Sequence, residues 1–564
     1  MANTKKYWQG IEEVKQDPEF LKNLNQEFSG QSVEDFLQDE NLVQSNVSRR
    51  DFLKFLGFSI TAASLAACET PVIKSIPYAV KPEEIIPGKA NWYASAYYDG
   101  NEFGAILVKT REGRPIFIQG NKEAGVWGAI NARINSSVLS LYDTNRYQAP
   151  LLNGKDTTWD QLDKWVSEQL NKAVASSKPV YLVTPTVISP STQAIIDAFK
   201  AKYSGTEGEQ KIKHVTFDAV SYSAILNAHQ ESFGRRVIPS YDFSKAKTIV
   251  GIGADFLANW LNAPVYAAQY AKTRKPENGQ MSRHYQFESI LSVTGANADV
   301  RMAVKPSQWK DVLVTLYNKI SVKLGGSKLP GKEINDVRID RAADDLLKSK
   351  GESLVVCGWN NTDAQIIVNA VNSMLGNYGK TLSIADPLLT KKGDDNDVVK
   401  WVLEVEKNNA SGVIFWNCDP VYTLPDGDKL SEALQKIEFT VAIVTKPNET
   451  STVCKAVAPD HHYLESWGDA QPATSVYFTA QPVIAPLYKT RQFQDSLLKW
   501  SGNSDSYENY LKNFALQNIL KTQDIQQWNK LLHDGIFKLE VTENTSDNVA
   551  DVKAAADNLS KFKK

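Results

Sequence analysis

The sequence is poor in the residues that bind metals. Its 564 residues include four cysteines and six histidines, and no two cysteines stand in a C-x-x-C spacing. An iron–sulfur cluster takes four cysteine thiolates, and structural zinc sites take closely spaced sets of cysteine and histidine. The sequence therefore excludes a self-contained ferredoxin and a cysteine-rich zinc site. We expect no catalytic residue, no cofactor ligand and no metal centre in this chain.

Excess charge of one sign and long apolar runs are also missing. The 63 basic residues nearly balance the 65 acidic ones, which leaves a net charge of −2. The chain thus lacks the basic footprint of a nucleic-acid binder, and no nucleic-acid partner is expected. No apolar run reaches the roughly 18 to 20 residues that span a bilayer. What the sequence does have is 42% hydrophobic residues and 13 tryptophans, which is ample for several packed domains.

An export signal is predicted near the N-terminus. The stretch Ser48–Lys54 reads SRRDFLK, and a moderately apolar run follows it to Ala67. The paired Arg49 and Arg50 ahead of an apolar run too short for a membrane span are typical of twin-arginine export. That route carries folded proteins, so assembly or cofactor loading would take place in the cytoplasm. The alternative is a buried amphipathic helix, because the apolar residues also recur at helical spacing.

The export signal ends in Leu65-Ala66-Ala67-Cys68, which resembles a bacterial lipobox. Cys68 is therefore the predicted lipid anchor and the first residue of the mature chain, since several acyl chains on one cysteine anchor a protein stably. The alternative is an ordinary small residue at the end of a signal peptide. The expected location is the periplasmic side of the bacterial inner membrane. The three remaining cysteines allow at most one disulfide, and the spacing selects no pair.

Composition and patterning divide the chain into six segments. Short apolar runs alternate with amphipathic helical stretches after residue 154, which is typical of parallel sheets covered by helices on both faces. We therefore predict an α/β fold with doubly wound parallel sheets and a small β-rich domain before them. The apolar runs are Val180–Val183, Val215–Phe217, Lys247–Val250, Leu354–Cys357, Leu382–Ile384, Val413–Trp416 and Val441–Val444. The predicted segments are an acidic N-terminal extension (1–47), the twin-arginine signal with lipobox (48–68), a proline-rich tether with the β-rich domain (69–154), two α/β domains (155–345 and 346–500) and a helical tail (501–564).

Two motifs invite a functional interpretation and receive a structural one. Gly251-Ile252-Gly253 begins a dinucleotide fingerprint, but Phe256 stands where the third glycine belongs, so a tight turn is the favoured interpretation. The run Asp460–Glu465 is the only ligand-rich cluster. Its adjacent His461 and His462 would point to opposite faces of an extended backbone, so one metal could hardly bind both. Docking or packing is the predicted role of two polar loops, His461–Asp469 and Asn417–Tyr422.

Longer stretches resemble a known family. Tyr93–Pro150 is similar to the N-terminal region of the molybdopterin (bis-guanine-dinucleotide) oxidoreductases, through LVKTREGRPIFIQGN and NARINSSVLSLYD. Within this region the runs Phe103–Thr110 and Ile116–Ile118, joined by the glycine-containing turn Glu112–Pro115, predict a β-hairpin. In that family the segment before this hairpin carries cysteines for a [4Fe–4S] cluster. Here it reads NWYASAYYDGNEFGA and has no cysteine. The resemblance therefore implies the molybdopterin-oxidoreductase-like multi-domain fold without the cluster of its first domain.

A narrower resemblance covers residues 7 to about 540. YWQGIEE, SRRDFLK, HHYLESWGDA and QPVIAPLY are similar to the molybdopterin-oxidoreductase-like B subunit of bacterial alternative complex III. In that subgroup this part has neither molybdenum nor pterin. The [4Fe–4S] and [3Fe–4S] clusters belong to a ferredoxin-like region, which lies in a C-terminal continuation or in a partner subunit. The expected partners are that iron–sulfur domain or subunit, multihaem cytochrome c subunits and quinone-binding integral membrane subunits.

The resemblance implies a function for the whole assembly and a supporting role for this chain. We expect a non-catalytic structural subunit of a membrane-bound quinol:electron-acceptor oxidoreductase in respiratory electron transfer. One alternative is an active molybdopterin oxidoreductase of the polysulfide or thiosulfate reductase type. Another is a periplasmic lipoprotein that binds a small ligand in the pterin cleft. The sequence leaves open whether the chain is complete or part of a longer polypeptide.

Overall fold

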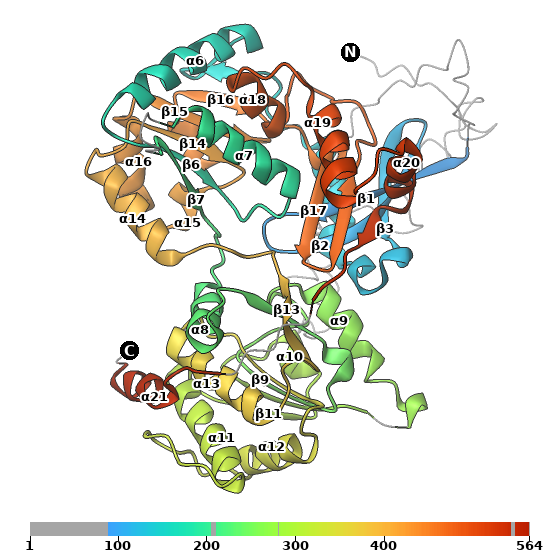
Figure 1. Cartoon of the computed structure of the whole chain (residues 1–564), viewed down its shortest axis with the longest axis vertical. Coiled ribbons are helices and arrows are strands. Elements are labelled where there is room, and N and C mark those ends of the chain that lie inside the picture. The colour runs from blue at the N-terminus through green and yellow to red at the C-terminus, as the bar shows by residue number, and fades with distance from the viewer. Residues whose placement is uncertain (1–87, 205–209, 280, 543–547, 563–564) are drawn as a thin grey trace, which may run out of the picture. The chain divides into compact units, whose positions relative to one another are not determined.

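The structure, a computed structural model, describes residues 88–204, 210–279, 281–542 and 548–562, which all belong to the compact unit Pro82–Lys564 (Figure 1). The predicted export signal with Arg49 and Arg50, the predicted anchor Cys68 and the acidic extension lie outside the described residues. In the described part, no helix is long and apolar enough to cross a membrane.

A three-stranded antiparallel sheet opens the described chain. It consists of β1 (Ala90–Tyr98), β2 (Phe103–Arg111) and β3 (Arg114–Gly120) in that order. Glu112 and Gly113 connect β2 to β3 with φ angles of 53° and 75°, so both residues are left-handed, as a two-residue hairpin turn requires. The predicted hairpin is confirmed. The short helices η2 (Lys122–Gly128), α5 (Ala132–Ser136) and η3 (Ser137–Tyr142) follow.

A seven-stranded sheet forms the first doubly wound layer. Its order is β5-β4-β16-β15-β14-β6-β7, and the strands from β16 to β7 are parallel. The strands are β4 (Leu151–Leu152), β5 (Lys155–Asp156), β6 (Val180–Thr184), β7 (Ile212–Thr216), β14 (Gly412–Trp416), β15 (Phe439–Val444) and β16 (Ala456–Pro459). Every residue of β6, β15 and β16 is buried, as expected for strands covered on both faces.

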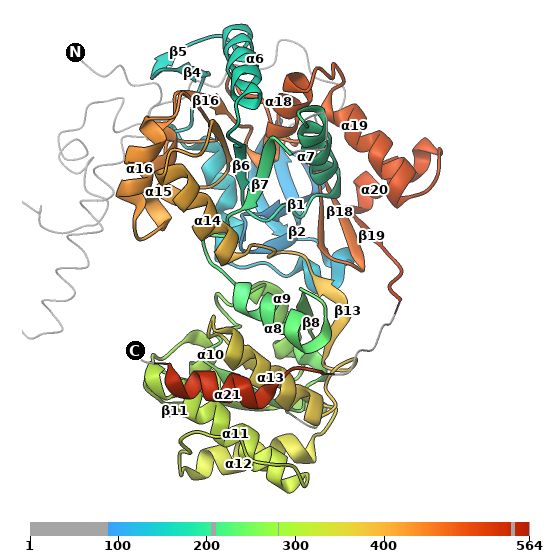
Figure 2. The ribbon, with the colours of Figure 1, turned by 60° about the vertical axis from the view of Figure 1, so that its left-hand side comes forward.

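Alternate residues of these strands enter two different cores. Leu182 packs with α6 (Trp159–Ala175), α7 (Pro190–Lys202) and α18 (Phe493–Trp500) on one face. Its neighbours Tyr181 and Val183 pack with α14 (Asp395–Glu406) and α16 (Gly427–Gln435) on the other. Figures 1 and 2 show the sheet between these two sets of helices. The short helices α15 (Pro420–Thr423) and α17 (Glu449–Val453) lie in the connections after β14 and β15.

A second parallel sheet has the order β11-β10-β9-β12. Its strands are β9 (Thr248–Ile252), β10 (Arg283–Glu288), β11 (Val300–Ala303) and β12 (Ser353–Cys357). The surrounding helices are α8 (Ser223–Phe233), α9 (Ala263–Lys272), α10 (Val293–Ala296), α11 (Trp309–Lys323), α12 (Val337–Lys348) and α13 (Thr362–Met374). The C-terminal α21 (Val552–Lys561) buries Ala556 and Leu559 against this core, and Figure 2 shows it across α11 and α13.

The predicted run Leu382–Ile384 belongs to a different kind of sheet. It opens β13 (Leu382–Leu388), which pairs antiparallel with β8 (Ile238–Tyr241) and β17 (Gly468–Ala473). β18 (Val476–Ala480) and β19 (Ile536–Lys538) complete this five-stranded sheet. The prediction of a parallel strand here was wrong. The reason is visible in the burial: Leu382 and Ile384 are buried and Ser383 between them is half-buried, which is the alternation of a strand with one covered face.

The sheets do not follow the predicted boundary near residue 345. Strand β12, from the predicted segment 346–500, pairs with β9 of the segment 155–345. Strand β14 pairs with β6 in the same way, in the other parallel sheet. Each predicted segment therefore contributes strands to both parallel sheets, because apolar runs predict strands but not their partners. The tail after residue 500 contains α19 (Tyr507–Phe514), α20 (Ile525–Asp534) and α21.

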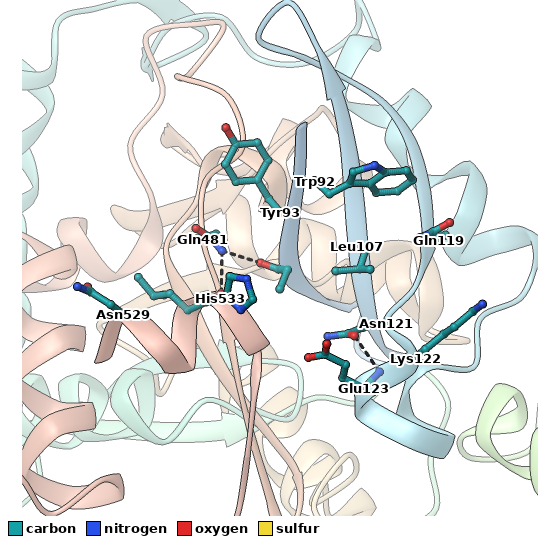
Figure 3. Close-up of a pocket in the computed structure, with 12 residues that line it drawn as sticks. Trp92, Tyr93, Leu107, Gln119, Asn121, Lys122, Glu123, Gln481, Asn529 and His533 are labelled. Carbon is teal, nitrogen blue, oxygen red and sulfur yellow. Dashed lines mark hydrogen bonds between the residues drawn. The ribbon is translucent and has the colours of Figure 1, made fainter. Parts of the chain in front are cut away.

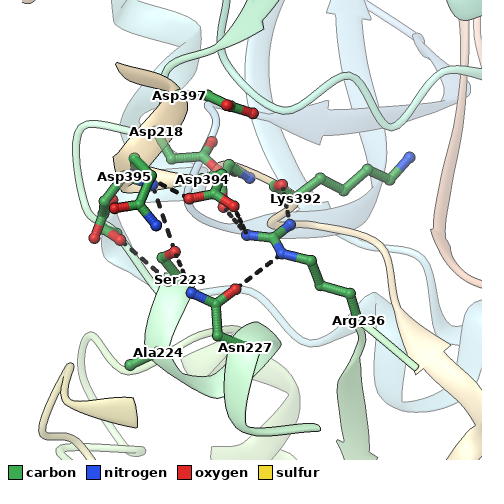
Figure 4. A network of polar contacts seen from close by, with 12 residues as sticks. Asp218, Ser223, Ala224, Asn227, Arg236, Lys392, Asp394, Asp395 and Asp397 are labelled. Atoms are coloured by element: carbon green, nitrogen blue, oxygen red, sulfur yellow. Dashed lines mark hydrogen bonds and ion pairs between the residues drawn. The ribbon is translucent and has the colours of Figure 1, made fainter. Parts of the chain in front are cut away.

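The two crossings of the chain between these sheets are tied together by polar contacts (Figure 4). Arg236 donates to the carbonyl oxygens of Lys392 and Gly393 at 2.9 and 2.8 Å, and to the side chain of Asn227 at 3.0 Å. Asp218, which follows β7, accepts a bond from the Gly393 amide at 3.0 Å. The outgoing and returning segments thus hold each other in place.

Candidate functional site

The strand order places a crevice at the carboxyl ends of β6 and β14. These strands are neighbours, but the chain leaves β6 toward β7 on one side and leaves β14 toward β15 on the other. Such switch points are where open parallel sheets bind ligands. A cavity of about 340 Å³ lies here, lined by Pro185 and Thr186 after β6 and by Trp416 and Asn417 at the end of β14. We refer to it as the switch-point cleft.

Two other parts of the chain close the switch-point cleft. The end of β1 contributes Tyr97 and Tyr98, and the turn after it contributes Asp99. The run from Asp460 to Asp469 supplies the opposite wall. The residue types of the second wall mark it as a polar cluster in the sequence, whereas nothing in the sequence marks the first wall as part of a site. No sequence signal joins them, because the two walls are more than 360 residues apart and meet only through the fold.

The adjacent histidines both line the switch-point cleft, but their rings bond different partners. The Nδ1 atom of His461 lies 2.5 Å from Thr490 Oγ1, whereas Nε2 of His462 lies 2.8 Å from Ser140 Oγ. Burial lowers the pKa of both imidazoles, that of His462 to about 4, so both rings are neutral near pH 7. Among the described residues, no group of three or more His, Cys, Asp or Glu side chains could hold a metal ion.

A buried ion pair supports this wall from behind. Arg146 and Glu465 are both 3% exposed, and the distance from Nη2 to Oε2 is 2.6 Å. Glu465 also accepts bonds from the amides of His462 and Leu487, at 2.9 and 3.0 Å. Burial alone would raise the pKa of Glu465, but these hydrogen bonds outweigh it and lower the pKa below its usual value. The pair therefore fixes the backbone that carries the histidines.

The charge of the switch-point cleft is acidic. Three aspartates line it, Asp99, Asp460 and Asp469, and none of its lining residues is lysine or arginine. Burial raises the pKa of Asp460 to about 7 and also raises the pKa of Asp469. A pyrophosphate-bearing cofactor requires backbone or cationic donors directed at its phosphates. This lining has three carboxyl groups and no cationic side chain, so it does not fit such a group.

The polar groups of the cleft are bonded to the protein itself. Asp460 accepts bonds from Trp416 Nε1 at 2.8 Å and from the amides of His461 and Phe493. Asp469 accepts from the hydroxyls of Ser191 and Tyr477, at 2.7 and 2.9 Å. These side chains therefore have their hydrogen-bonding capacity largely filled without a ligand. They hold the walls together.

The three described cysteines are free thiols in apolar surroundings. Cys357 packs in the core of the four-stranded sheet, and Cys418 packs against α14 and α16 with Cys454 nearby. Burial raises the pKa of all three thiols, those of Cys357 and Cys454 to about 12. None lines the switch-point cleft, so no thiolate there could bind a metal.

The glycine turn after β9 is closed by aromatic side chains. Gly253 has φ of +62°, and a Cβ atom there would lie 2.6 Å from the Trp309 ring. Phe256, at the position of the missing third glycine, is fully buried and stacks on Phe243 at 4.3 Å between ring centroids. The structure thus fills with side chains the space that a dinucleotide phosphate would need. The loop Asn417–Tyr422 is a packing element: Asp419 caps α15 and accepts a bond from Thr450 Oγ1 at 2.7 Å.

One polar cluster lies outside the switch-point cleft. Trp260 Nε1, both amide atoms of Asn262 and the Tyr266 hydroxyl are buried and have no partner among the described protein atoms. A buried unpaired hydroxyl costs about 1–3 kcal/mol. We therefore expect Tyr266→Phe to raise the free energy of unfolding by about 1 kcal/mol, measured by urea denaturation.

Tyr477→Phe is the matched control for that substitution. Tyr477 is also fully buried, but its hydroxyl donates to Asp469 at 2.9 Å, so removing it takes one of the two donors from that buried carboxylate oxygen, the other being the Ser191 amide. The control should lose about 1–2 kcal/mol. A loss of similar size in Tyr266→Phe would contradict the unpaired hydroxyl and show that ordered water bonds it.

A relative and a solved structure are similar to this chain. No protein-family model matches the chain. The chain is 22% identical over 520 residues to a protein of Nitratidesulfovibrio vulgaris named "Menaquinone reductase, molybdopterin-binding-like subunit", over 81% of this chain and 72% of that protein. The solved structure of acetylene hydratase from Pelobacter acetylenicus superimposes with a TM-score of 0.59 and 10% identity, over 79% of this chain and 74% of that one. The chain therefore has the multi-domain α/β fold of molybdopterin enzymes, and its sequence is similar to that of a molybdopterin-binding-like subunit.

Proposed function

We propose that this chain is a non-catalytic structural subunit of a membrane-bound quinol:electron-acceptor oxidoreductase of the alternative complex III type. The relative named as a menaquinone reductase subunit supports a role in a quinone oxidoreductase complex. The sequence resemblance to the alternative complex III B subunit supports the finer assignment. The complex would oxidise a quinol and pass the electrons to a cytochrome c or to an oxidase, while this chain positions its neighbours.

The chemistry of the switch-point cleft carries this proposal. A working molybdopterin site needs a ligand for the metal and donors for the cofactor phosphates. The cleft has three carboxylates, no cation and no thiol in its lining, and its carboxylates are bonded to neighbouring protein groups. We therefore propose that the chain holds neither molybdenum nor pterin. The fold then serves as a scaffold, since its buried strands and helices are retained without the site.

The partners and location belong to the same proposal. We place the chain on the periplasmic side of the inner membrane, exported by the twin-arginine route through Arg49 and Arg50 and anchored by lipid on Cys68. Its partners would be an iron–sulfur ferredoxin-like domain or subunit with [4Fe–4S] and [3Fe–4S] clusters, multihaem cytochrome c subunits and quinone-binding membrane subunits.

Purification of the complex from native membranes, tagged on this chain, tests the proposal. We expect quinol-oxidising activity in the assembly, less than about 0.1 molybdenum per chain by elemental analysis, and none of that activity in the isolated chain. The intact mass should correspond to a chain that begins at Cys68 and carries a diacylglyceryl group and a fatty acid.

Each of three other results would contradict one part of the proposed function. Near-stoichiometric molybdenum would favour the active polysulfide or thiosulfate reductase type. A chain purified alone with an organic ligand retained in native mass spectrometry would favour a ligand-binding lipoprotein, for which the cavity of about 340 Å³ has room. A mature chain that begins at Met1 would rule out the lipid anchor on Cys68.

A further inference from the structure

At the hairpin end of the three-stranded sheet, one face carries a row of exposed side chains that includes two aromatic rings. Trp92 lies opposite Lys109 in the neighbouring strand, and Lys109 lies opposite Phe117 in the next. Residues directly opposite in antiparallel strands share a face, so the three side chains form one row across the sheet. Trp92 is 43% exposed and Phe117 is 42% exposed. The Lys109 ammonium lies 5.6 Å from the centroid of the Trp92 ring.

A β-bulge extends this row. The register shifts between Lys109 and Thr110, and the extra residue on β3 is Ile116, which is 48% exposed. Bulges at a sheet edge redirect a side chain. Beyond it Tyr142, also exposed, donates to the carbonyl oxygen of Pro115 at 2.8 Å. We call Trp92, Lys109, Ile116 and Phe117 the aromatic face.

The surroundings of the aromatic face are basic. Arg111 and Arg114 lie opposite each other at the tip of the hairpin. Lys109 lies in the row itself, and Lys122 lines the adjacent groove together with one acidic residue, Glu123. The whole chain carries a net charge of only −2, so this concentration is local. Aromatic residues and arginine are enriched in protein–protein interfaces, so this surface has the composition of an interface.

A groove runs beside the aromatic face, between the sheet and α20 (Figure 3). It has a volume of about 600 Å³, with Trp92 and Leu107 on the sheet and Asn529 and His533 on the helix. The carbonyl oxygen of Ala94 points out of the sheet edge and accepts a bond from Gln481 at 3.0 Å. The backbone of Trp92, two residues earlier in the strand, faces the same edge of the sheet. Within the described strands β1 pairs only with β2, so β1 is an edge strand.

We propose that the aromatic face and this groove are a docking surface for an acidic surface of a protein partner. The partner would place a carboxylate-bearing segment along the groove, with its charges on Lys109, Lys122 and the hairpin arginines. The groove is concave and has a polar helical wall, which fits a protein segment better than a flat bilayer. The identification of this partner as another subunit rests on the proposed function; the surface itself does not.

Zero-length cross-linking in the purified complex tests the acidic partner. A carbodiimide joins a lysine amine to a carboxylate in direct contact, so we expect links from Lys109 or Lys122 to Asp or Glu of another subunit. Lys109→Arg keeps the charge and should remove only the Lys109 links. Hydroxyl-radical oxidation of Trp92 and Phe117 should be about fivefold lower in the complex than in the isolated chain, and high salt should reverse this.

Substitutions give a second measurement. Phe117→Glu combined with Arg114→Glu should lower the amount of co-purified partner about tenfold. The control combines Val399→Glu with Leu403→Glu on α14, where the apolar side chains are 58% and 44% exposed. It should leave the complex intact. Urea denaturation of both variants separates loss of docking from loss of folding.

The outcomes distinguish this inference from the proposed function. A complete complex in which Trp92 and Phe117 remain oxidisable, or in which no link leaves Lys109 or Lys122, overturns the docking surface alone. Protection of the aromatic face by anionic vesicles without any partner also overturns it, in favour of a bilayer contact. If no other subunit co-purifies with the unmodified chain, the proposed function fails and the identification of the partner fails with it.

Discussion

Replacement of Arg146 by methionine is expected to cost about 3–5 kcal/mol of unfolding free energy. Arg146 and Glu465 are each 3% exposed, so removing the guanidinium leaves a carboxylate buried without its counter-ion. The loss includes the bond from Arg146 Nη1 to the carbonyl oxygen of Leu141 at 2.9 Å. Urea denaturation at pH 7 measures the effect. The near-ultraviolet circular dichroism signal should also weaken, because the aromatic side chains around the buried pair become less rigidly packed.

The matched control is Arg338→Met. Arg338 pairs with Asp336 at 2.7 Å, but its side chain is 41% exposed, so the loss should stay below about 1 kcal/mol. The pH dependence gives a second test. Hydrogen bonds lower the folded pKa of Glu465, so its contribution is present above the unfolded pKa and is lost as the pH falls through the folded value. Equal losses in the two variants would contradict the buried pair.

Asp460 is expected to give the opposite pH dependence. Burial raises its pKa to about 7 in the folded chain, although Trp416 Nε1 and the amides of Phe493 and His461 donate to it. Between about pH 4 and pH 7 the folded state then keeps a proton that the unfolded state has lost. Stability contributed by this proton is complete below the unfolded pKa and declines as the pH rises through the folded one, by at most about 4 kcal/mol.

Asp460→Asn tests this dependence, because an amide does not titrate. The variant should show a flatter profile of unfolding free energy between pH 4.5 and 7.5, about these pKa values. It also exchanges one acceptor of Trp416 for a donor, so its stability at pH 4.5 should be lower than that of the unmodified chain. Asp386→Asn is the control, since Asp386 is half-buried and bonds Ser475 outside the switch-point cleft. Parallel profiles for Asp460→Asn and the unmodified chain would contradict the raised pKa.

Local patterning predicted much of the fold because it depends on neighbours in the sequence. The hairpin at Glu112–Gly113, the fully buried strands such as β6 and β15, and the helix α13 all follow from turn residues and apolar periodicity. Phe256 was enough to favour a packed turn over a dinucleotide site, and the structure shows its ring fully buried. Backbone geometry predicted that His461 and His462 would not act on one ligand together, and their rings bond different partners although both line the switch-point cleft.

Only the tertiary structure decided how these elements combine. Apolar runs carry no record of which strand they pair with, so the discontinuous sheets and the antiparallel β13 could not be predicted. The pair Arg146–Glu465 joins residues 319 positions apart, and the turn at Tyr97–Asp99 meets Asp460–Asp469 across a similar distance. Burial in the folded chain raises the pKa of Asp460, and neighbouring protein groups donate hydrogen bonds to the carboxyl groups of the cleft. The sequence by itself determined the residue types and their local geometry; desolvation and long-range pairing, which exist only in the folded chain, determined what those residues do.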